Sequence, residues 1–273
     1  AIRGMNTAVL WSPFFVSFAV GQLYLPSQSA WLGIIFGLLV ALLFNLLSMR
    51  FLIGKFTLNY LIEAISCVKP IFPRLLILSI SVLAVGQIFD KTALNAIVIV
   101  IPILVIVQML RRPETIKSII SNLNNLILKS GDEMLLISVS MFLGSILSGS
   151  AEIQNFMSNN IGNNFPFWAM IILLPLIVWI FGLIGIHPII TSAPILSLFG
   201  PLLSLWEAAF LMQAHLIGWC AGTATSFTSL SVLTTAENFR LHISKLVLGP
   251  NLFATGCLTF IGAILLITLN YLL

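Results

Sequence analysis

The sequence is constrained most by how few charged residues it has and by where they lie. Only 7% of its residues are charged and 59% are hydrophobic, whereas roughly a quarter of an ordinary soluble domain is charged. The charged residues are bunched, and the windows between them are long enough to cross about 30 Å of hydrocarbon at about 1.5 Å per residue. The sequence therefore predicts an all-α fold of polytopic transmembrane helices, with the lipid bilayer as its main solvent.

The remaining composition excludes several other classes of protein. The net charge is +4, but the Lys and Arg residues lie in short links between apolar windows, so no basic surface for nucleic acid is expected. The cysteines Cys67, Cys220 and Cys257 lack the spacing of a zinc site or a disulfide framework. The chain opens Ala-Ile-Arg-Gly and its first apolar stretch contains Ser12-Pro13, which we interpret as the C-terminal portion of a longer chain rather than a signal peptide.

Apolar windows follow one another along the whole chain. They cover residues 8–25, 31–53, 75–89, 93–110, 134–147, 167–184, 189–199, 202–219 and 252–272. Residues 57–68 and 114–128 mix apolar and polar positions at helical spacing, which predicts helices lying along the membrane interface.

The positive-inside rule gives an orientation for these windows. With the N-terminal end in the cytoplasm, all basic residues except Lys91 fall inside, provided that residues 167–199 enter and leave the membrane on the outer side. The cytoplasmic ones are Arg3, Arg50, Lys55, Lys69, Arg74, Arg111, Arg112, Lys117, Lys129, Arg240 and Lys245. A re-entrant hairpin satisfies this condition, and so does a pair of spanning helices. We expect a multi-pass protein of the cell (inner) membrane with its C-terminus outside.

The turn of this hairpin, 182–192, reads Gly-Leu-Ile-Gly-Ile-His-Pro-Ile-Ile-Thr-Ser. A helix that stops at membrane depth implies a cavity, because its freed backbone groups need partners. Pro suits the first position of the second arm, and the amide ends of that arm favour an anion. The imidazole at 187 either carries a proton or binds a neighbouring carbonyl. The candidate binding residues are Gly185, His187, Pro188, Thr191 and Ser192.

A second interruption is predicted where hydroxyl residues follow two glycines at 218–229. Gly lowers helix propensity, and Ser and Thr compete for backbone hydrogen bonds, so the helix is expected to unwind. Freed carbonyls and hydroxyls suit Na⁺ or a small polar solute. The alternative is close helix packing, which uses the same small residues. The candidate ligands are Thr223, Thr225, Ser226, Thr228 and Ser229.

The first apolar segment repeats this pattern. Residues 4–13 contain Asn6 and Ser12 and precede an apolar run and a spanning helix, in the same order as residues 218–226 and 252–272. Counting spans puts the two copies in opposite orientations, which is typical of the inverted repeats of secondary transporters. Asn6 and Ser12 therefore join the candidate site.

In this order of segments the chain resembles the ion-transporter superfamily, which includes the divalent anion:sodium symporters. Pro188 and Thr191 have the general character of that family's hairpin tip, and Thr225-Ser226 that of its helix break. The resemblance implies three domains: 1–54 as the tail of a first repeat, 55–74 as a cytoplasmic interfacial linker, and 75–273 as a second repeat. The second repeat would contain three helices, a hairpin at 167–199, a broken helix at 202–236 and a final helix at 252–272.

The resemblance further implies a homodimer in which the hairpin and the broken helix bind solute and move against a scaffold formed by the early helices. The expected function is cation-coupled transport of a small organic anion by alternating access, with H⁺ or Na⁺ as the coupling ion and no other metal or cofactor. The alternatives are the large membrane subunit of a tripartite carrier that depends on a binding protein, or a scaffold that transports nothing. Glu207 and His215 share a helix face, but no catalytic pattern accompanies them, so we do not expect an enzyme.

Overall fold

The computed structural model describes residues 2–53, 66, 69–70, 72–89, 93–111, 131, 134–135, 137–162 and 165–272. Every regular element in these ranges is a helix, which confirms the predicted all-α class. Apart from Ser66, the two predicted interfacial segments, 57–68 and 114–128, lie outside the described residues.

The chain forms two compact units. The larger unit combines Ala1–Ser48 with Leu135–Leu273, and the smaller unit is Met49–Met134. The predicted domains were divided at residues 54 and 75. In the structure, residues 1–48, which were assigned to the first repeat, belong to the same unit as the predicted hairpin at 167–199.

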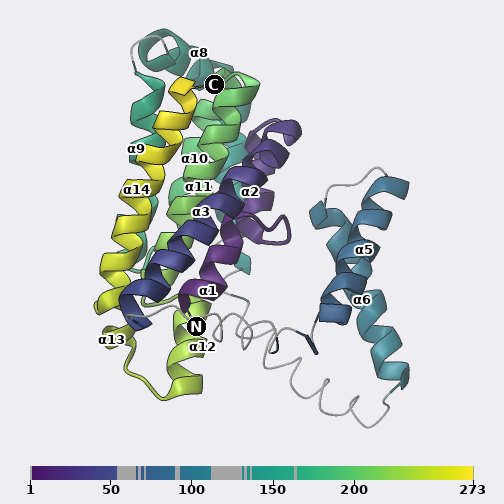
Figure 1. The fold of residues 1–273 in the computed structure, drawn as a ribbon. Coiled ribbons are helices and arrows are strands. Elements are labelled where there is room, and N and C mark those ends of the chain that lie inside the picture. The colour runs from purple at the N-terminus through teal and green to yellow at the C-terminus, as the bar shows by residue number, and fades with distance from the viewer. Residues whose placement is uncertain are drawn as a thin grey trace. The chain divides into compact units, whose positions relative to one another are not determined.

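The helices of the larger unit differ greatly in length (Figure 1). In chain order they are α1 (Ile2–Thr7), the 3-10 turn η1 (Ala8–Leu10), α2 (Val16–Tyr24), α3 (Ser27–Ile53), an apolar helix Ile137–Gly149, α8 (Ala151–Met157), the π-helical turn η2 (Ser158–Gly162), α9 (Phe167–Leu183), α10 (Pro188–Phe199), η3 (Gly200–Leu202), α11 (Leu205–Thr225), α12 (Leu230–Phe239), α13 (Ile243–Val247) and α14 (Pro250–Leu272).

Helix α11 is the core of the larger unit. Nearly all of its residues from Ala208 to Thr225 are buried, including Phe210, Leu216 and Ile217. It packs mainly on α9 and α14, and its other sides meet α1, η1 and α2. The helix begins at a capping box in which Ser204 and Glu207 each bind the other's backbone N–H. Glu207 therefore lies at the exposed start of the helix.

Glycines allow α9 and α11 to approach closely. A Cβ atom at Gly218 would lie 2.7 Å from Pro175 Cα, and one at Gly182 would lie 2.7 Å from Gly222 Cα. Such approaches are typical of packed membrane helices, in which small residues bring two backbones together. Gly218 and Gly222 lie inside the regular part of α11, where they allow close packing, and the non-helical residues of the predicted interruption, 218–229, are 226–229.

The outward-facing side chains of the larger unit are large and apolar. Phe253 is 78% exposed, Ile35 64% and Ile264 60%. Two stretches, Leu205–Phe239 and Ile243–Leu272, are long and apolar enough to cross a bilayer. Core helices of soluble proteins share this length and composition, but here many large apolar side chains are also exposed.

The smaller unit contains two described helices, α5 (Phe72–Ile88) and α6 (Ala93–Arg111). They pack through a small apolar cluster in which Val82, Ala96 and Val100 are buried. Their limits match the predicted windows 75–89 and 93–110 to within a few residues.

Candidate functional site

Two helices of the larger unit meet at a tight turn, residues 184–187, between α9 and α10. Gly185 has φ 88°, a left-handed conformation that glycine adopts without steric cost. The N–H of Ile186 donates to Phe181 O at 3.0 Å and that of Gly185 to Gly182 O at 3.0 Å. These bonds satisfy carbonyls at the end of α9, as in a common helix C-terminal motif, so Gly185 ends the helix and turns the chain back along α9.

His187 caps the start of α10. Its Nδ1 accepts a hydrogen bond from the N–H of Ile189 at 3.3 Å, and the N–H of Ile190 donates to His187 O at 3.0 Å. Pro188, the first residue of α10, has no N–H. The first two amides of α10 are therefore bonded to His187 within the turn. Since Nδ1 accepts, the proton of a neutral His187 is on Nε2.

Thr191 and Ser192 bond to their own helix. Both hydroxyls donate to Pro188 O, at 3.0 Å for Thr191 and 2.8 Å for Ser192. Ser192 is fully buried. Among the described residues, Pro188 is the one predicted site residue to which these side chains bond, so the two hydroxyls stabilise the first turn of α10 and do not join the cluster described below.

The next interruption separates α11 from α12. Regular helix ends at Thr225, residues 226–229 are non-helical, and Ser229 caps α12 by accepting from the N–H of Val232 at 3.3 Å. The carbonyls at the end of α11 are taken by side chains: Thr223 O accepts from Ser229 Oγ at 2.5 Å, and Ala224 O accepts from Asn251 Nδ2 at 2.5 Å. The Thr225 hydroxyl donates back to Ala221 O at 2.8 Å.

Asn6, from the start of the chain, lies at this interruption. Its Oδ1 is 3.2 Å from the hydroxyl of Thr223, and its Nδ2 donates to Ser231 Oγ at 3.3 Å. Ser231 Oγ is in turn 3.2 Å from Ser229 Oγ and donates to Thr223 O at 3.2 Å. We call Asn6, Thr223, Ser229 and Ser231 the polar cluster. It joins the first segment of the chain to the end of α11.

A second set of contacts links the interruption to the α9–α10 turn. The hydroxyl of Thr228 donates to Gly185 O at 3.1 Å and lies 3.1 Å from Ser226 Oγ. Ser226 is 1% exposed. Three predicted site residues, Gly185, Ser226 and Thr228, are thus brought together from two different parts of the sequence.

The first segment is also interrupted, at residues 11–15 between η1 and α2. Ser12 is buried and its Oγ accepts from the N–H of Phe14 at 3.4 Å. The carbonyl of Leu10 faces Gly37 of α3 and accepts from Gln213 Nε2 at 3.4 Å. Ser12 therefore has a local role in shaping the interruption, and the structure records no bond between it and the polar cluster.

Several polar residues that contribute to this region were not predicted. Ser231 completes the polar cluster, and Asn45 of α3 donates to Thr7 Oγ1 at 2.9 Å. Asn251 and Gln213 bind freed carbonyls, as described above. Each is an amide or hydroxyl residue within an apolar helix, where polar side chains commonly join one helix to another, and this signal was present in the sequence.

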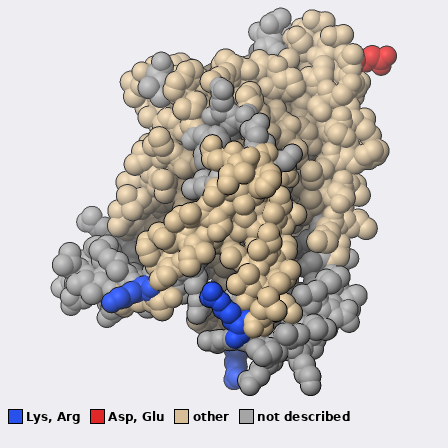
Figure 2. Space-filling view, turned by 90° about the vertical axis from the view of Figure 1, so that its right-hand side faces the viewer, with Lys and Arg blue, Asp and Glu red and all other residues tan. Residues whose placement is uncertain are grey.

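Charge is absent from most of the larger unit. Residues 4–49, 153–206, 208–236 and 246–273 contain no Asp, Glu, Lys or Arg. Glu152 opens α8, whereas Arg240 and Lys245 lie beside α12 and α13. Helix α8 and the pair α12 and α13 are at opposite ends of the larger unit in Figure 1. Figure 2 shows Lys and Arg at the lower edge of one face and an acidic residue at its upper edge.

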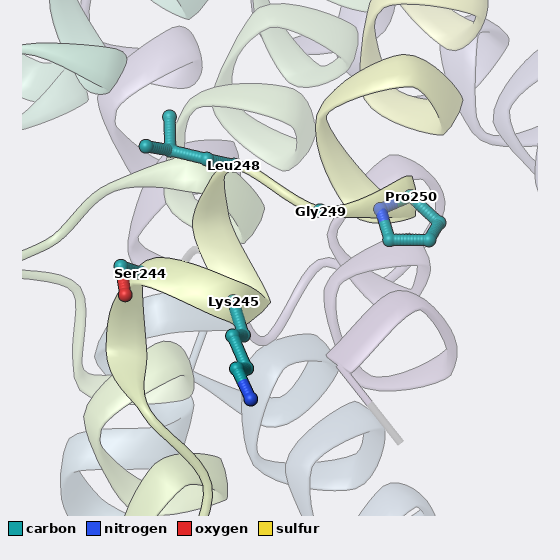
Figure 3. A pocket seen from close by; sticks show the side chains of 5 residues that line it. All are labelled: Ser244, Lys245, Leu248, Gly249 and Pro250. Atoms are coloured by element: carbon teal, nitrogen blue, oxygen red, sulfur yellow. The ribbon is translucent and has the colours of Figure 1, made fainter.

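The pocket in Figure 3 lies elsewhere. Its volume is about 450 Å³, and Ser244, Lys245, Leu248, Gly249 and Pro250 line it where α13 meets α14. None of the predicted site residues belongs to it. Among the described residues there is also no group of three His, Cys, Asp or Glu side chains placed to hold a metal ion.

Comparison with known proteins gives no relative: no family model, no curated protein and no solved structure matches this chain.

Proposed function

We propose that the larger unit is the solute-binding core of a secondary membrane transporter, which moves a small organic anion together with a cation by alternating access. In this proposal α1–α2 and α11–α12 are discontinuous membrane helices, and α9–α10 is a hairpin that enters and leaves on the outer side. The observation that carries the proposal is the polar cluster, in which Asn6 joins Thr223 and Ser231 where two interrupted helices meet.

The distribution of charge and apolar surface supports insertion into a membrane. The long uncharged stretches of the larger unit separate Glu152 at one end from Arg240 and Lys245 at the other. Basic residues accumulate on the cytoplasmic side of membrane proteins, so the α12–α13 end is cytoplasmic in this proposal. The exposed side chains of α3 and α14, such as Ile35 and Phe253, then face lipid.

The bonding at the interruptions supports a polar site within the bilayer. Backbone carbonyls freed at membrane depth require partners, and here side chains supply them, as Ser229 does for Thr223 O and Asn251 for Ala224 O. Hydroxyl and carbonyl oxygens gathered at helix breaks are the ligands that secondary transporters use for coupling cations and polar solutes. His187 Nε2–H provides a neutral donor for a carboxylate next to this region.

Uptake by reconstituted protein tests the proposal. The purified chain in liposomes should accumulate radiolabelled succinate or lactate when a proton or sodium gradient is imposed. Ser229→Ala and Asn6→Ala should each lower uptake roughly tenfold, since about 1.4 kcal/mol of lost binding corresponds to a factor of ten. Thr268→Ala is the matched control, because this hydroxyl is exposed on α14 and bonds only to Ile264 O in its own helix.

The close packing of α9 on α11 favours one rival function, a membrane scaffold that transports nothing. Single cysteines introduced at positions 187 and 226, in a background without the native cysteines, distinguish the two. A water-soluble thiol reagent should label both positions in a transporter, and added solute should slow the labelling. Absence of labelling together with absence of uptake would support the scaffold.

A further inference from the structure

Three buried polar atoms lie near the contact of α11 with the first interrupted segment and have no hydrogen-bond partner among the described residues. They are Ser17 Oγ, Gln213 Oε1 and His215 Nδ1. All three residues are at most 1% exposed. An unpaired buried polar group costs about 1–3 kcal/mol. Gln213 and His215 are two positions apart on α11 and therefore face different sides of the helix, Gln213 toward Leu10 and His215 toward Ser17. This region is distinct from the polar cluster, whose hydroxyls and amide bind one another.

The hydrogen bond of His215 fixes which of its nitrogens is unpaired. Nε2 lies 2.9 Å from the backbone carbonyl oxygen of Ser17. A carbonyl can only accept, so Nε2 carries the proton and a neutral His215 has a bare lone pair on Nδ1. The unpaired atom of Gln213 is also an acceptor, the side-chain carbonyl, because its Nε2 donates to Leu10 O. The unpaired Nδ1 of His215 is thus a buried acceptor that can take a proton.

Among the described residues, the charged ones on α11 and on the elements that pack against it lie away from His215, which is at the middle of α11. They are Glu207 at the start of α11, Arg3 on α1, Arg50 near the end of α3, Glu237 on α12 and Lys245 on α13. Helices α1, α12 and α13 meet the end of α11 that leads into α12. The sequences of α2, α9, α10 and α14 contain no Asp, Glu, Lys or Arg.

The titratable neighbours of His215 are also few. Cys220 is buried on α11, one turn further along. Tyr24 of α2 directs its hydroxyl to Met141 O at 3.3 Å. The ring of Trp219 lies between His215 and His187 and makes an edge-to-face contact with each imidazole. The centroid distances are 5.4 Å to His215 and 5.6 Å to His187. His215 is therefore the one imidazole in contact with both α2 and Trp219, and through Trp219 it is linked to the hairpin turn.

We propose that His215 is the proton-binding residue of the transporter, an inference that rests on the proposed function above. Nδ1 takes a proton from water on the side where the site is open, and the neutral imidazole becomes an imidazolium with one positive charge. The same nitrogen returns the proton to water on the other side. A buried cation without a counter-ion is costly, and no carboxylate of the surrounding helices balances it. The negative charge of the bound anion does, so that proton and anion favour one another's binding.

Nitrogen NMR of the imidazoles tests proton binding without requiring transport. The chain has three histidines, so protein labelled with ¹⁵N-histidine and held in lipid nanodiscs gives few signals. His215→Gln assigns those of His215, since a glutamine amide keeps the donor to Ser17 O but does not titrate. We expect the neutral Nε2–H tautomer at high pH and the imidazolium as the pH falls, with protonation favoured by added succinate. A neutral tautomer throughout the pH range in which the protein stays folded would overturn the proposal.

Transport provides the second readout. In liposomes, His215→Gln should lose the stimulation of uptake by an inward proton gradient and keep exchange of labelled for unlabelled solute. His242→Gln is the matched control, because His242 is exposed ahead of α13, and it should respond to the gradient like the unmodified protein. Two outcomes would contradict the proton site but leave the proposed transport function intact. In one, the proton gradient still stimulates uptake by His215→Gln; in the other, only a sodium gradient stimulates uptake by the unmodified protein. If no solute is transported at all, the NMR titration still decides whether His215 binds a proton.

Discussion

The side chain of Asn6 lies 3.2 Å from the hydroxyl of Thr223, although 217 positions separate them in the sequence. The amide uses both of its ends, since its nitrogen donates to Ser231 at 3.3 Å. It thereby fixes the first helix of the larger unit to the interruption between α11 and α12. A hydroxyl residue at this position is too short to replace both bonds, and a carboxylate would lack the donor.

Asn6→Ala should destabilise the folded protein by about 1–3 kcal/mol, because it removes the two hydrogen bonds of Asn6 to Thr223 and Ser231. Asn6 and Ser231 bond to each other, so their effects should not add. The double variant Asn6→Ala/Ser231→Ala should lose roughly 1 kcal/mol less unfolding free energy than the two single variants lose together. Denaturant unfolding in detergent micelles measures these free energies. Asn6→Ala combined with Thr268→Ala should be additive, and additivity in both pairs would argue against the cluster.

Gly37→Ala should be strongly destabilising. A Cβ atom at this position of α3 would overlap the carbonyl of Leu10, which is itself held by Gln213, and overpacking of this kind costs about 1–3 kcal/mol or more. Gly4→Ala is the matched control, since a Cβ there meets nothing within 4 Å. Thermal unfolding followed by size-exclusion chromatography should give a lower unfolding temperature for Gly37→Ala than for Gly4→Ala. Equal unfolding temperatures would show that α3 does not approach Leu10.

Gly218→Ala distinguishes packing from unwinding. The added methyl group would lie 2.7 Å from Pro175 Cα and 3.0 Å from Val178 Cβ, so it should push α9 from α11 and lower stability. In an exposed helix the same change is favourable by about 1 kcal/mol, because alanine is the better helix former. A variant of unchanged or raised thermal stability would indicate that the glycine serves flexibility instead.

Gly185→Ala should destabilise through the backbone alone. Its φ of 88° is unfavourable for alanine by roughly 1 kcal/mol, whereas its nearest neighbour, Thr228 Cγ2, would lie at an ordinary 3.6 Å from an added Cβ. Gly185→Asn should be tolerated better, because asparagine adopts left-handed conformations more readily. Equal unfolding free energies for the two variants would show that the turn has another conformation in solution.

The sequence predicted the helical elements more accurately than the details of the site. Long apolar windows predicted helices such as α3 and α14 to within a few residues. The interruption after α11 was predicted within 218–229, and in the structure helix continues through Gly222 to Thr225, so that only residues 226–229 are non-helical. Glycine both weakens a helix and allows close packing, and only the position of α9 decides between these two effects.

The partners of the polar side chains were harder to predict. Thr191 and Ser192 are hydroxyl residues like Ser229, yet they bond to Pro188 O while Ser229 binds across the interruption. At the ends of a helix, a hydroxyl can bond either to the backbone of its own helix or to a group outside it. Asn6 was identified because its segment repeats the pattern of 218–226, whereas Ser231 follows the interruption and no repeat marked it.

The carbonyls at the end of α11 already have hydrogen-bond donors from Ser229 and Asn251. A cation that reaches these oxygens must displace the donors, and the displaced hydroxyl and amide must then find new acceptors. In the proposed transporter, cation binding would thus be an exchange of hydrogen-bond partners. Such a site would release its ligand readily, as repeated transport requires.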